Sequence, residues 1–454
     1  MISRRAFARA SLAALASVAL PEQAAALART PQGGRLELSV PWSLSRLDPH
    51  DPLDAAAALF AHAVCDPMYA LDAQQQPYAA LAEALPERQG AETIVRLRPG
   101  LVSARGAQLD ARDLVHSIER ARKPSGARLE AIGRPKRHPR EPLAVLFPTG
   151  DVEAVARALA SPLVALVPRG FDPRRPDGTG AFAARLSAGE LLLEQNLRAA
   201  RGPSFLDAVR VRAAPDLRAS LRAFESGQDD LGWLGAGLHG QRREAVAFDL
   251  GAAALVVLVA SRELGPEGRP GALQSLVDAI PRDRLAHLGL GELPNGRGGP
   301  GLSGAPVELL VDAAEPHLVE IADSLAAALG SPDTPVSVRR LGASALEERR
   351  ARPGRTLSLH TLRPHGASSV EVLGALAALD DPRRAREIAR RPVRGAKPAS
   401  ARSLAAELRV AVVGELRVRG AAAPDLVLAR GEGSVWDLGA SYRRRRPSTH
   451  ARSR

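Results

Sequence analysis

The chain of 454 residues is predicted to be an α/β protein with two or three domains, for three reasons. Short apolar or alternating runs typical of β-strands alternate with helical patterns along the chain, which favours an α/β architecture. The length is sufficient to bury sizeable hydrophobic cores. Beyond the N-terminal segment, no run reaches the roughly 18 apolar residues that a membrane span requires.

The first half of the chain has the clearest pattern of elements. Residues 35–40 are predicted to form a strand and residues 54–63 a helix. Residues 93–98 alternate apolar and charged side chains, as a half-buried strand does, and a Pro-Gly turn follows them. Asp110 is expected to cap a helix over residues 111–122, because its carboxylate can accept hydrogen bonds from the first free backbone N–H groups.

The rest of the chain continues this alternation. Further predicted helices are residues 152–160, 216–225, 273–280, 317–329 and 403–413. Further predicted strands are residues 191–196, 208–212, 230–233, 253–260, 307–311, 336–341 and 357–361. Residues 291–304, rich in Gly and Pro, are predicted to form a mobile loop.

The N-terminus has the pattern of a secretory signal. Arg4-Arg5 precede an apolar run over residues 10–20, which is too short to span a bilayer, and residues 24–28 offer small side chains for cleavage. The paired arginines followed by Phe7 resemble a twin-arginine signal, with an ordinary amphipathic helix as the alternative. We therefore expect residues 1–28 to be a signal peptide and the mature protein to be soluble and periplasmic. No Cys follows the apolar run, so a lipoprotein is not expected.

Charge and composition argue against nucleic-acid binding. The formal net charge is +12, but the basic residues are almost all arginine, and aromatic residues make up only 3% of the chain. Nucleic-acid binding would need basic residues interleaved with aromatic ones on one element. The basic runs at residues 134–140, 383–391 and 443–446 are instead interpreted as solvated surface. Weak attraction of the last run to anionic lipids stays open.

No motif predicts an enzyme, a cofactor or a metal centre. The sequence has no HExxH, GxSxG or P-loop motif and no GxGxxG that opens a helix. Cys65 is the single cysteine, so neither an internal disulfide nor a thiolate metal site can form, and a buried inert thiol is expected. A Ser/His/Asp triad assembled by the fold stays open, because distance in sequence does not exclude it.

Short segments between Leu47 and Leu114 resemble a known family. The segments are Leu47-Asp48-Pro49, Asp66-Pro67-Met68-Tyr69, Leu81-Ala82-Glu83, Leu97-Arg98-Pro99-Gly100-Leu101-Val102 and Gly106-Ala107-Gln108-Leu109-Asp110-Ala111-Arg112-Asp113-Leu114. They are similar to the N-terminal lobe of the family 5 extracellular solute-binding proteins, the peptide-type and nickel-type receptors of ABC importers.

The resemblance implies a two-lobe periplasmic-binding-protein fold, type II-like, with a hinge and a ligand cleft between the lobes. It implies a first lobe over residues 29–250, a second lobe over 251–410, a return into the first lobe over 411–440 and a basic disordered tail over 441–454. It also implies a monomeric, non-catalytic receptor without a cofactor. Such a receptor closes its lobes on a peptide, a peptide-like molecule or a small organic solute, and its partner is an ABC permease.

Candidate ligand-binding residues lie at the ends of predicted strands, where this architecture opens its cleft. Those of the first lobe are Trp42, Ser43, Trp233, Leu234 and Gly235, and those of the second lobe are His360, Arg363 and His365. A tryptophan in so aromatic-poor a chain is either a core anchor or a ligand platform. Trp436, within the predicted return, is expected to pack in the core.

The second-lobe segment departs from the family. Peptide receptors of the family carry an aspartate there that pairs with the ammonium group of the ligand, whereas residues 357–369 contain no acid. Burying an ammonium group without a counter-charge is costly, so a ligand that bears a carboxylate or phosphate, or an uncharged one, becomes more plausible. His360 and His365 leave open the binding of nickel or a metal chelate. The weaker resemblance of the second lobe leaves open a degenerate receptor that acts as a periplasmic sensor or interaction protein.

Overall fold

The computed structural model describes residues 32–233, 242, 244–299, 301–391, 399–431 and 435–444. The predicted signal peptide, the candidate residues Leu234 and Gly235, and residues 445–454 of the predicted tail lie outside this part of the chain. Within it, no helix combines the length and the apolar character that crossing a membrane demands.

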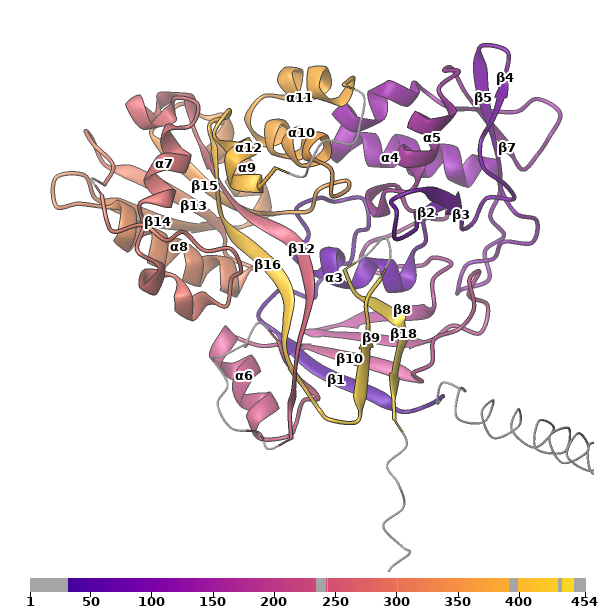
Figure 1. The fold of residues 1–454 in the computed structure, drawn as a ribbon, viewed down its shortest axis with the longest axis horizontal. Coiled ribbons are helices and arrows are strands. Elements are labelled where there is room, and N and C mark those ends of the chain that lie inside the picture. Colours follow the sequence, from indigo (N-terminus) through magenta and orange to yellow (C-terminus); the bar gives the residue numbers. More distant parts are fainter. Residues whose placement is uncertain are drawn as a thin grey trace, which may run out of the picture.

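Two long antiparallel strands, β12 (Val246–Ala260) and β16 (Val410–Ala422), form the middle of a ten-stranded sheet. They run from one half of the molecule into the other and thereby join two lobes (Figure 1). In the first lobe the sheet continues through β11 (Leu231–Trp233), β1 (Arg35–Val40), β10 (Ala208–Ala213), β9 (Glu190–Gln195) and β8 (Phe182–Ser187). In the second lobe it continues through β15 (Thr356–Leu362), β13 (Val307–Asp312) and β14 (Val336–Leu341).

Helix α3 (Ala55–Val64) is the central helix of the first lobe. Every residue of α3 except His62 is buried, because the helix contacts β8 and β12 of the large sheet as well as β18 (Asp437–Arg443). Strand β18 pairs with β17 (Leu426–Ala429). Asp54 begins the helix, since its carboxylate accepts a hydrogen bond from the backbone N–H of Ala57.

The first lobe also contains a subdomain with its own hydrophobic cluster. Its helices are α4 (Ala111–Leu129) and α5 (Val152–Leu159), and its strands are β2 (Tyr69–Leu71), β3 (Pro77–Ala79), β4 (Glu87–Gln89), β5 (Glu92–Arg96), β6 (Lys136–Arg137) and β7 (Ala144–Phe147). The predicted cap of α4 is confirmed, because Asp110 accepts a hydrogen bond from the backbone N–H of Arg112 at 2.7 Å.

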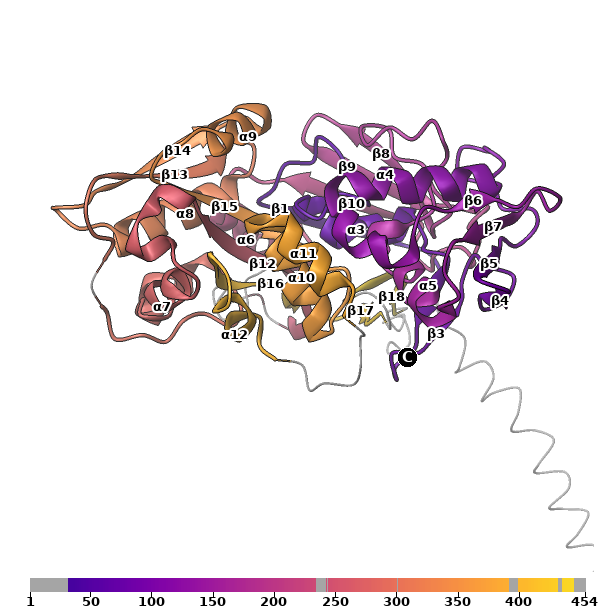
Figure 2. The ribbon, with the colours of Figure 1, turned by 90° about the horizontal axis from the view of Figure 1, so that it is seen from above.

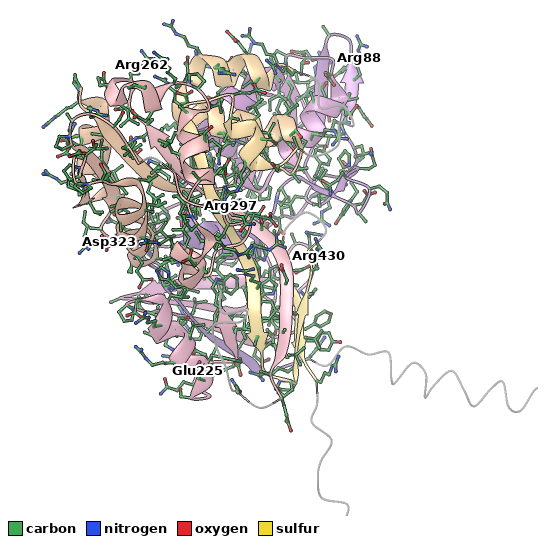
Figure 3. All side chains as sticks on the ribbon, turned by 60° about the vertical axis from the view of Figure 1, so that its left-hand side comes forward. Arg88, Glu225, Arg262, Arg297, Asp323 and Arg430 are labelled. Carbon is green, nitrogen blue, oxygen red and sulfur yellow. The ribbon has the colours of Figure 1, made fainter. Side chains whose placement is uncertain are left out.

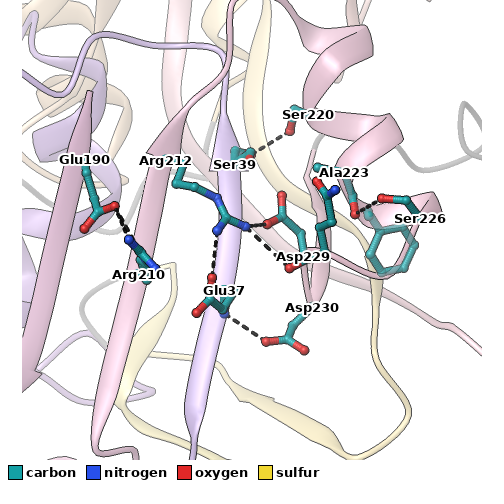
Figure 4. Close-up of polar contacts among 12 residues, drawn as sticks. Glu37, Ser39, Glu190, Arg210, Arg212, Ser220, Ala223, Ser226, Asp229 and Asp230 are labelled. Carbon is teal, nitrogen blue, oxygen red and sulfur yellow. Dashed lines mark hydrogen bonds and ion pairs between the residues drawn. The ribbon is translucent and has the colours of Figure 1, made fainter. Parts of the chain in front are cut away.

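Polar contacts fix the first-lobe strands to one another and to helix α6 (Leu217–Glu225) (Figure 4). Arg212 on β10 donates to the carboxylate of Glu37 on β1 at 2.9 Å. The backbone N–H of Glu37 donates to Asp230 at 2.8 Å, and the hydroxyl of Ser220 on α6 donates to the carbonyl oxygen of Ser39 at 2.6 Å. These bonds hold α6 and the following strand β11 against β1.

In the second lobe, β12 is buried on both faces because helices cover both sides of the sheet. Alternate residues enter two cores: Val256, Leu258 and Ala260 enter one, and Leu255, Val257 and Val259 enter the other. The first core includes α7 (Ala272–Asp278) and α8 (Pro316–Leu329), and the second includes α10 (Ser369–Asp380), α11 (Pro382–Ala389) and α12 (Ala401–Ala405). Helix α9 (Ala343–Ala351) contacts β13.

The charged residues are dispersed over the surface. Arg88, Glu225, Arg262 and Asp323 lie at the rim of the molecule in the view of Figure 3, and all four are exposed. Acids and arginines often pair there, as Asp323 does with Arg340 at 3.0 Å. The excess of arginine is therefore interspersed with carboxylates.

The predicted α/β class and two-lobe architecture are confirmed, with two clear errors among the elements. The disordered tail predicted from residue 441 is wrong at its start, because residues 441–443 belong to β18 and Arg443 pairs with Asp230 and Asp425. The helix predicted over residues 403–413 is wrong, because α12 ends at Ala405 and β16 begins at Val410. The strand is apolar at consecutive positions since it is buried on both faces, and periodicity alone does not separate such a strand from a buried helix. Helices α9 and α10 have no counterpart among the predicted elements. The predicted lobe boundaries at residues 250 and 410 fall inside β12 and at the first residue of β16.

Candidate functional site

A cavity of ≈ 470 Å³ lies between the two lobes. On the first-lobe side it is lined by residues 51–53, by the C-terminal part of α4 and by Glu130. On the second-lobe side it is lined by α9, by the segment that follows β15, and by α10 and α11, which lie beside α4 (Figures 1 and 2). The volume is within the range of roughly 300–1,000 Å³ that is usual for small-molecule sites.

The segment after β15 joins the second lobe to the first. The backbone N–H of Arg363 donates to the carbonyl oxygen of Pro52 at 2.7 Å. The hydroxyl of Ser161 donates to the carbonyl oxygen of His365 at 2.9 Å and lies 3.2 Å from Nδ1 of the same residue. Pro52 and Ser161 belong to the first lobe, so these bonds describe a closed arrangement of the lobes.

Arg363 is a buried cation without a carboxylate partner. The residue is 7% exposed, and its guanidinium makes one hydrogen bond within the described chain, from Nη1 to the carbonyl oxygen of Ala57 at 3.4 Å. Burial lowers the pKa of Arg363 to about 10, and the nearby carboxylate of Asp54 opposes this effect. Asp54 is already engaged, because it accepts hydrogen bonds from the backbone N–H groups of Ala57 and Asp48.

His62 is a second polar side chain close enough to Arg363 to feel its charge. Burial lowers the pKa of His62 to about 4, against the effect of Asp437, and Arg363 lowers it further, so the imidazole is neutral. Its Nε2 atom is buried and has no hydrogen-bond partner among the residues described. His62 is not among the residues that line the cavity, so this unpaired nitrogen is not assigned to the ligand site.

The four carboxylates that line the cavity already have partners. The pairs are Asp51 with Arg46 (2.7 Å), Glu347 with Arg350 (2.9 Å), Glu130 with Arg386 (3.0 Å) and Glu371 with the hydroxyl of Ser368 (2.8 Å). Arg122 and Lys123 of α4 add two cations to the wall. The cavity therefore has an excess of positive charge, to which Arg363 contributes without a compensating carboxylate.

A second contact between the lobes, here called the Glu315 contact, is formed by Pro41, Ser43, Glu315 and His317. The backbone N–H of His317 donates to the carbonyl oxygen of Pro41 at 3.2 Å, and the backbone N–H of Ser43 donates to the carboxyl group of Glu315. Burial, with the nearby carboxylate of Asp54 adding to it, raises the pKa of Glu315 to about 8. Glu315 is therefore largely protonated at neutral pH while the lobes are closed.

The three tryptophans of the chain form one cluster. Trp42 meets Trp233 edge to face with ring centroids 6.1 Å apart, and Trp233 stacks on Trp436 at 5.7 Å. All three lie in the core of the first lobe, and the residues that line the cavity do not include them. The ring of Trp42 also lies 6.2 Å from that of His317 in the second lobe. Trp42 is therefore a natural reporter of the separation of the lobes.

The structure distributes the predicted site residues over three places. Arg363 and His365 line the cavity, Trp42 and Ser43 lie at the Glu315 contact, and Trp233 is buried behind Trp42.

The predicted second-lobe residue His360 is buried in β15. It contacts the hydroxyl of Ser358 at 3.0 Å, and burial lowers its pKa to about 3. Among the described residues, no group of three or more His, Cys, Asp or Glu side chains is placed to hold a metal ion.

Three solved proteins show what the fold is similar to. The oligopeptide-binding protein AppA from Bacillus subtilis, solved in complex with a nonapeptide, is 14% identical, with a TM-score of 0.65 over 92% of this chain and 100% of AppA. NikA from Staphylococcus aureus, solved with Ni(L-His)2, is 12% identical, with a TM-score of 0.64 over 90% of this chain and 99% of NikA. AgaA from A. tumefaciens R10, solved with agropinic acid, is 15% identical, with a TM-score of 0.64 over 92% of this chain and 100% of AgaA.

No family model and no curated protein sequence matches the chain, so the likeness is one of fold. It extends over about nine-tenths of this chain and nearly the whole of each of the three proteins. The chain therefore has the two-lobe fold of the solute-binding proteins that the segments between Leu47 and Leu114 resemble.

Proposed function

We propose that the protein is a solute-binding receptor of an ABC importer and a divergent member of family 5. Its ligand is a peptide, a peptide-like molecule or another small organic solute, held between the lobes without any covalent step. The observation that carries the proposal is the cavity of ≈ 470 Å³ whose walls come from both lobes, in a fold whose lobes are joined by two long strands. A site divided between two hinged bodies is completed by closure, so binding and closure are linked.

The residues at the cavity suggest how closure traps a ligand. The ligand enters the open cleft and contacts the apolar walls of α10 and α11 together with Arg363 and His365. On closure, the backbone N–H of Arg363 reaches Pro52, and Ser161 reaches His365. The closed monomer then docks on the permease.

The test is a ligand screen of the mature protein, Arg29 onward, by thermal shift and small-angle X-ray scattering. The panel contains di- to pentapeptides, sugars, organic acids and nickel chelates. A ligand present at about 100 times its Kd adds roughly 2.7 kcal/mol to the free energy of unfolding if it binds only the folded protein. One class is expected to raise the Tm and reduce the radius of gyration. No response from any class would argue for the degenerate receptor instead.

Tryptophan fluorescence supplies a second readout. Trp42→Phe is expected to abolish a fluorescence change on ligand addition, because Trp42 faces His317 across the lobes. Trp436→Phe is the matched control, since Trp436 packs on Trp233 and Phe60 in the core of the first lobe. The prediction that Trp233 contacts the ligand fails if Trp233→Phe leaves the ligand affinity unchanged.

We propose that the receptor reaches the periplasm by twin-arginine export. The proposal is supported by Arg4-Arg5, the short apolar run that follows and the small-residue cleavage region. The double substitution Arg4→Lys and Arg5→Lys is expected to leave the precursor in the cytoplasm. Normal periplasmic yield of the double variant would argue against this route.

A further inference from the structure

The guanidinium of Arg363 carries a buried positive charge that no carboxylate of the described chain pairs with. A guanidinium offers five N–H donors, and that of Arg363 makes a single hydrogen bond of 3.4 Å within the described chain. Leaving a charge buried without a partner costs several kcal/mol, because the lost hydration is not replaced. A ligand group that supplies a negative charge at this point would remove that cost.

We infer that the enclosed solute is an organic carboxylate, and that its carboxylate group pairs with the guanidinium of Arg363. This inference rests on the proposed receptor function and specifies the ligand class. The planar fork of a guanidinium matches the two oxygens of a carboxylate. A carboxylate also carries one charge, as Arg363 does, whereas a phosphate monoester carries nearly two at neutral pH.

The surroundings of Arg363 do not oppose an anion. The lining carboxylates are each bound to an arginine or, in the case of Glu371, to the N-terminus of α10. Asp54 is the carboxylate that raises the pKa of Arg363 electrostatically, but its side chain already accepts the capping hydrogen bond of α3. His62 is neutral, because burial lowers its pKa to about 4.

The remainder of the cavity wall fits an apolar ligand body. The apolar lining side chains include Leu53 from the first lobe and Leu362, Val370, Ala375 and Leu379 from the second. Such a wall contributes roughly 25 cal/mol for each Å² of apolar ligand surface that it buries. The geometry therefore favours a carboxylate on an aliphatic or aromatic body over a small, fully hydrated anion.

Probes with a shared five-carbon alkyl body test the ligand class on the mature chain. Hexanoate is compared with hexanamide, pentylamine and pentyl phosphate, which keep this body and change only the head group, and phenylacetate and adipate extend the set. Isothermal titration calorimetry gives the Kd, and small-angle scattering gives closure. The carboxylates are expected to bind, and each neutral or cationic counterpart to bind at least about tenfold more weakly.

Three variants test whether Arg363 binds the carboxylate of the ligand. Arg363→Gln is expected to weaken carboxylate binding about ten- to a hundredfold, because a charged hydrogen-bonded pair is lost. Arg363→Lys is expected to restore part of the affinity, since the charge returns without the fork. Arg350→Gln is the control: it removes a charge from the same wall, but one that already pairs with Glu347, so at most about a fivefold effect is expected.

Ligand-free stability separates this role from a structural one. Without a ligand, the buried and unpaired charge of Arg363 lowers the stability of the protein. The Tm of ligand-free Arg363→Gln is therefore expected to equal or exceed that of the wild type. A lower Tm together with unchanged carboxylate affinity would overturn the inference. So would stronger binding of the amide, amine or phosphate than of hexanoate, which would leave the receptor function standing. If no member of the wider peptide, sugar, acid and chelate panel binds, the receptor function falls as well.

Discussion

Replacing Glu315 with glutamine is expected to make lobe closure independent of pH above about 7. Glu315 is buried at the contact with Ser43, where burial and then the carboxylates of Asp54 and Asp312 raise its pKa from 4.5 to about 8. Opening the lobes exposes the side chain to water, which returns its pKa toward the ordinary value. Between these two pH values the closed form therefore keeps a proton that the open form releases.

The size of the effect follows from the two pKa values of Glu315. One pKa unit corresponds to about 1.4 kcal/mol, so holding the lobes closed over an ionised Glu315 costs about 5 kcal/mol. Because the raised pKa belongs to an acid, the closed form loses stability as pH rises from 4.5, and the loss is complete above about 8. Opening avoids this cost, so the closed fraction falls before the folded fraction does.

The titration of His317 affects closure in a different part of the pH range. Burial lowers the pKa of His317 to about 4, so its neutral form favours closure progressively only as pH rises from about 4 to 6.5. Asp54, whose pKa burial raises to about 6, acts in the same direction as Glu315 but is fully ionised above pH 7. The interval from pH 7 to pH 9 therefore isolates Glu315.

The assay is the radius of gyration of the ligand-free protein at pH 7, 8 and 9, with tryptophan fluorescence measured on the same samples. The wild type is expected to expand over this range, and Glu315→Gln is expected to stay closed. Glu348→Gln makes the same charge change on an exposed side chain of α9 and is expected to behave like the wild type. A wild type that does not expand, or a Glu315→Gln variant that expands equally, would refute the reasoning.

Three further predictions concern stability, reactivity and closure. Gly420→Ala is expected to lower the free energy of unfolding by about 1–3 kcal/mol in urea titrations, because the new Cβ would overlap the carbonyl oxygen of Gly232. Gly374→Ala, where the new Cβ meets only an ordinary contact inside α10, should instead stabilise by about 0.5–1 kcal/mol. Burial raises the pKa of the Cys65 thiol well above its ordinary value, so a thiol reagent is expected to label it only after unfolding, and rapid labelling of the native protein would contradict this. Glu130→Gln removes the two ion pairs that Glu130 forms across the lobes with Arg386 and Arg390, and should shift closure by less than about 1 kcal/mol, an effect that disappears at 1 M salt.

The fold could be predicted where an element has a distinct start signal or a clear turn after it. Helix α3 is buried on nearly all sides, yet Asp54 marks its beginning. Residues 93–96 of β5 lie in the strand predicted before the Pro99-Gly100 turn, but the half-buried character expected of this strand is wrong, because Thr93, Ile94 and Val95 are all buried. Strand β16 gives no such signal. Val410 and Val412 enter one core while Ala411 and Val413 enter the other, so the run reads as apolar throughout. Only the pairing with β12, which is remote in sequence, identifies it as a strand.

The candidate site was predictable only in part, for a similar reason. Arg363 and His365 could be found because they follow a predicted strand and stand where the resembling family has an acid. Glu315 was not predicted, although it lies three residues after Asp312, the last residue of β13. The cavity residues of α10 were not predicted. Ser368 and Glu371 form a local capping box, and a local pattern of this kind does not indicate that the helix faces the first lobe.

Closure of the two lobes is balanced between a few favourable hydrogen bonds and the burial of two ionisable side chains. The register of β12 and β16 shifts near Gly251, whose φ is 119°, so the crossing strands contain an irregular segment that can bend more easily than a regular ladder. The described backbone bonds of Arg363 and His317 to the first lobe contribute about 0.5–1.5 kcal/mol each. Against them stand the burial of the Arg363 guanidinium and, as pH rises, of the Glu315 carboxylate. A ligand shifts such an equilibrium only by its difference in affinity for the two states. An anion that pairs with Arg363 supplies that difference, because it offsets the cost of burying the guanidinium in the closed form.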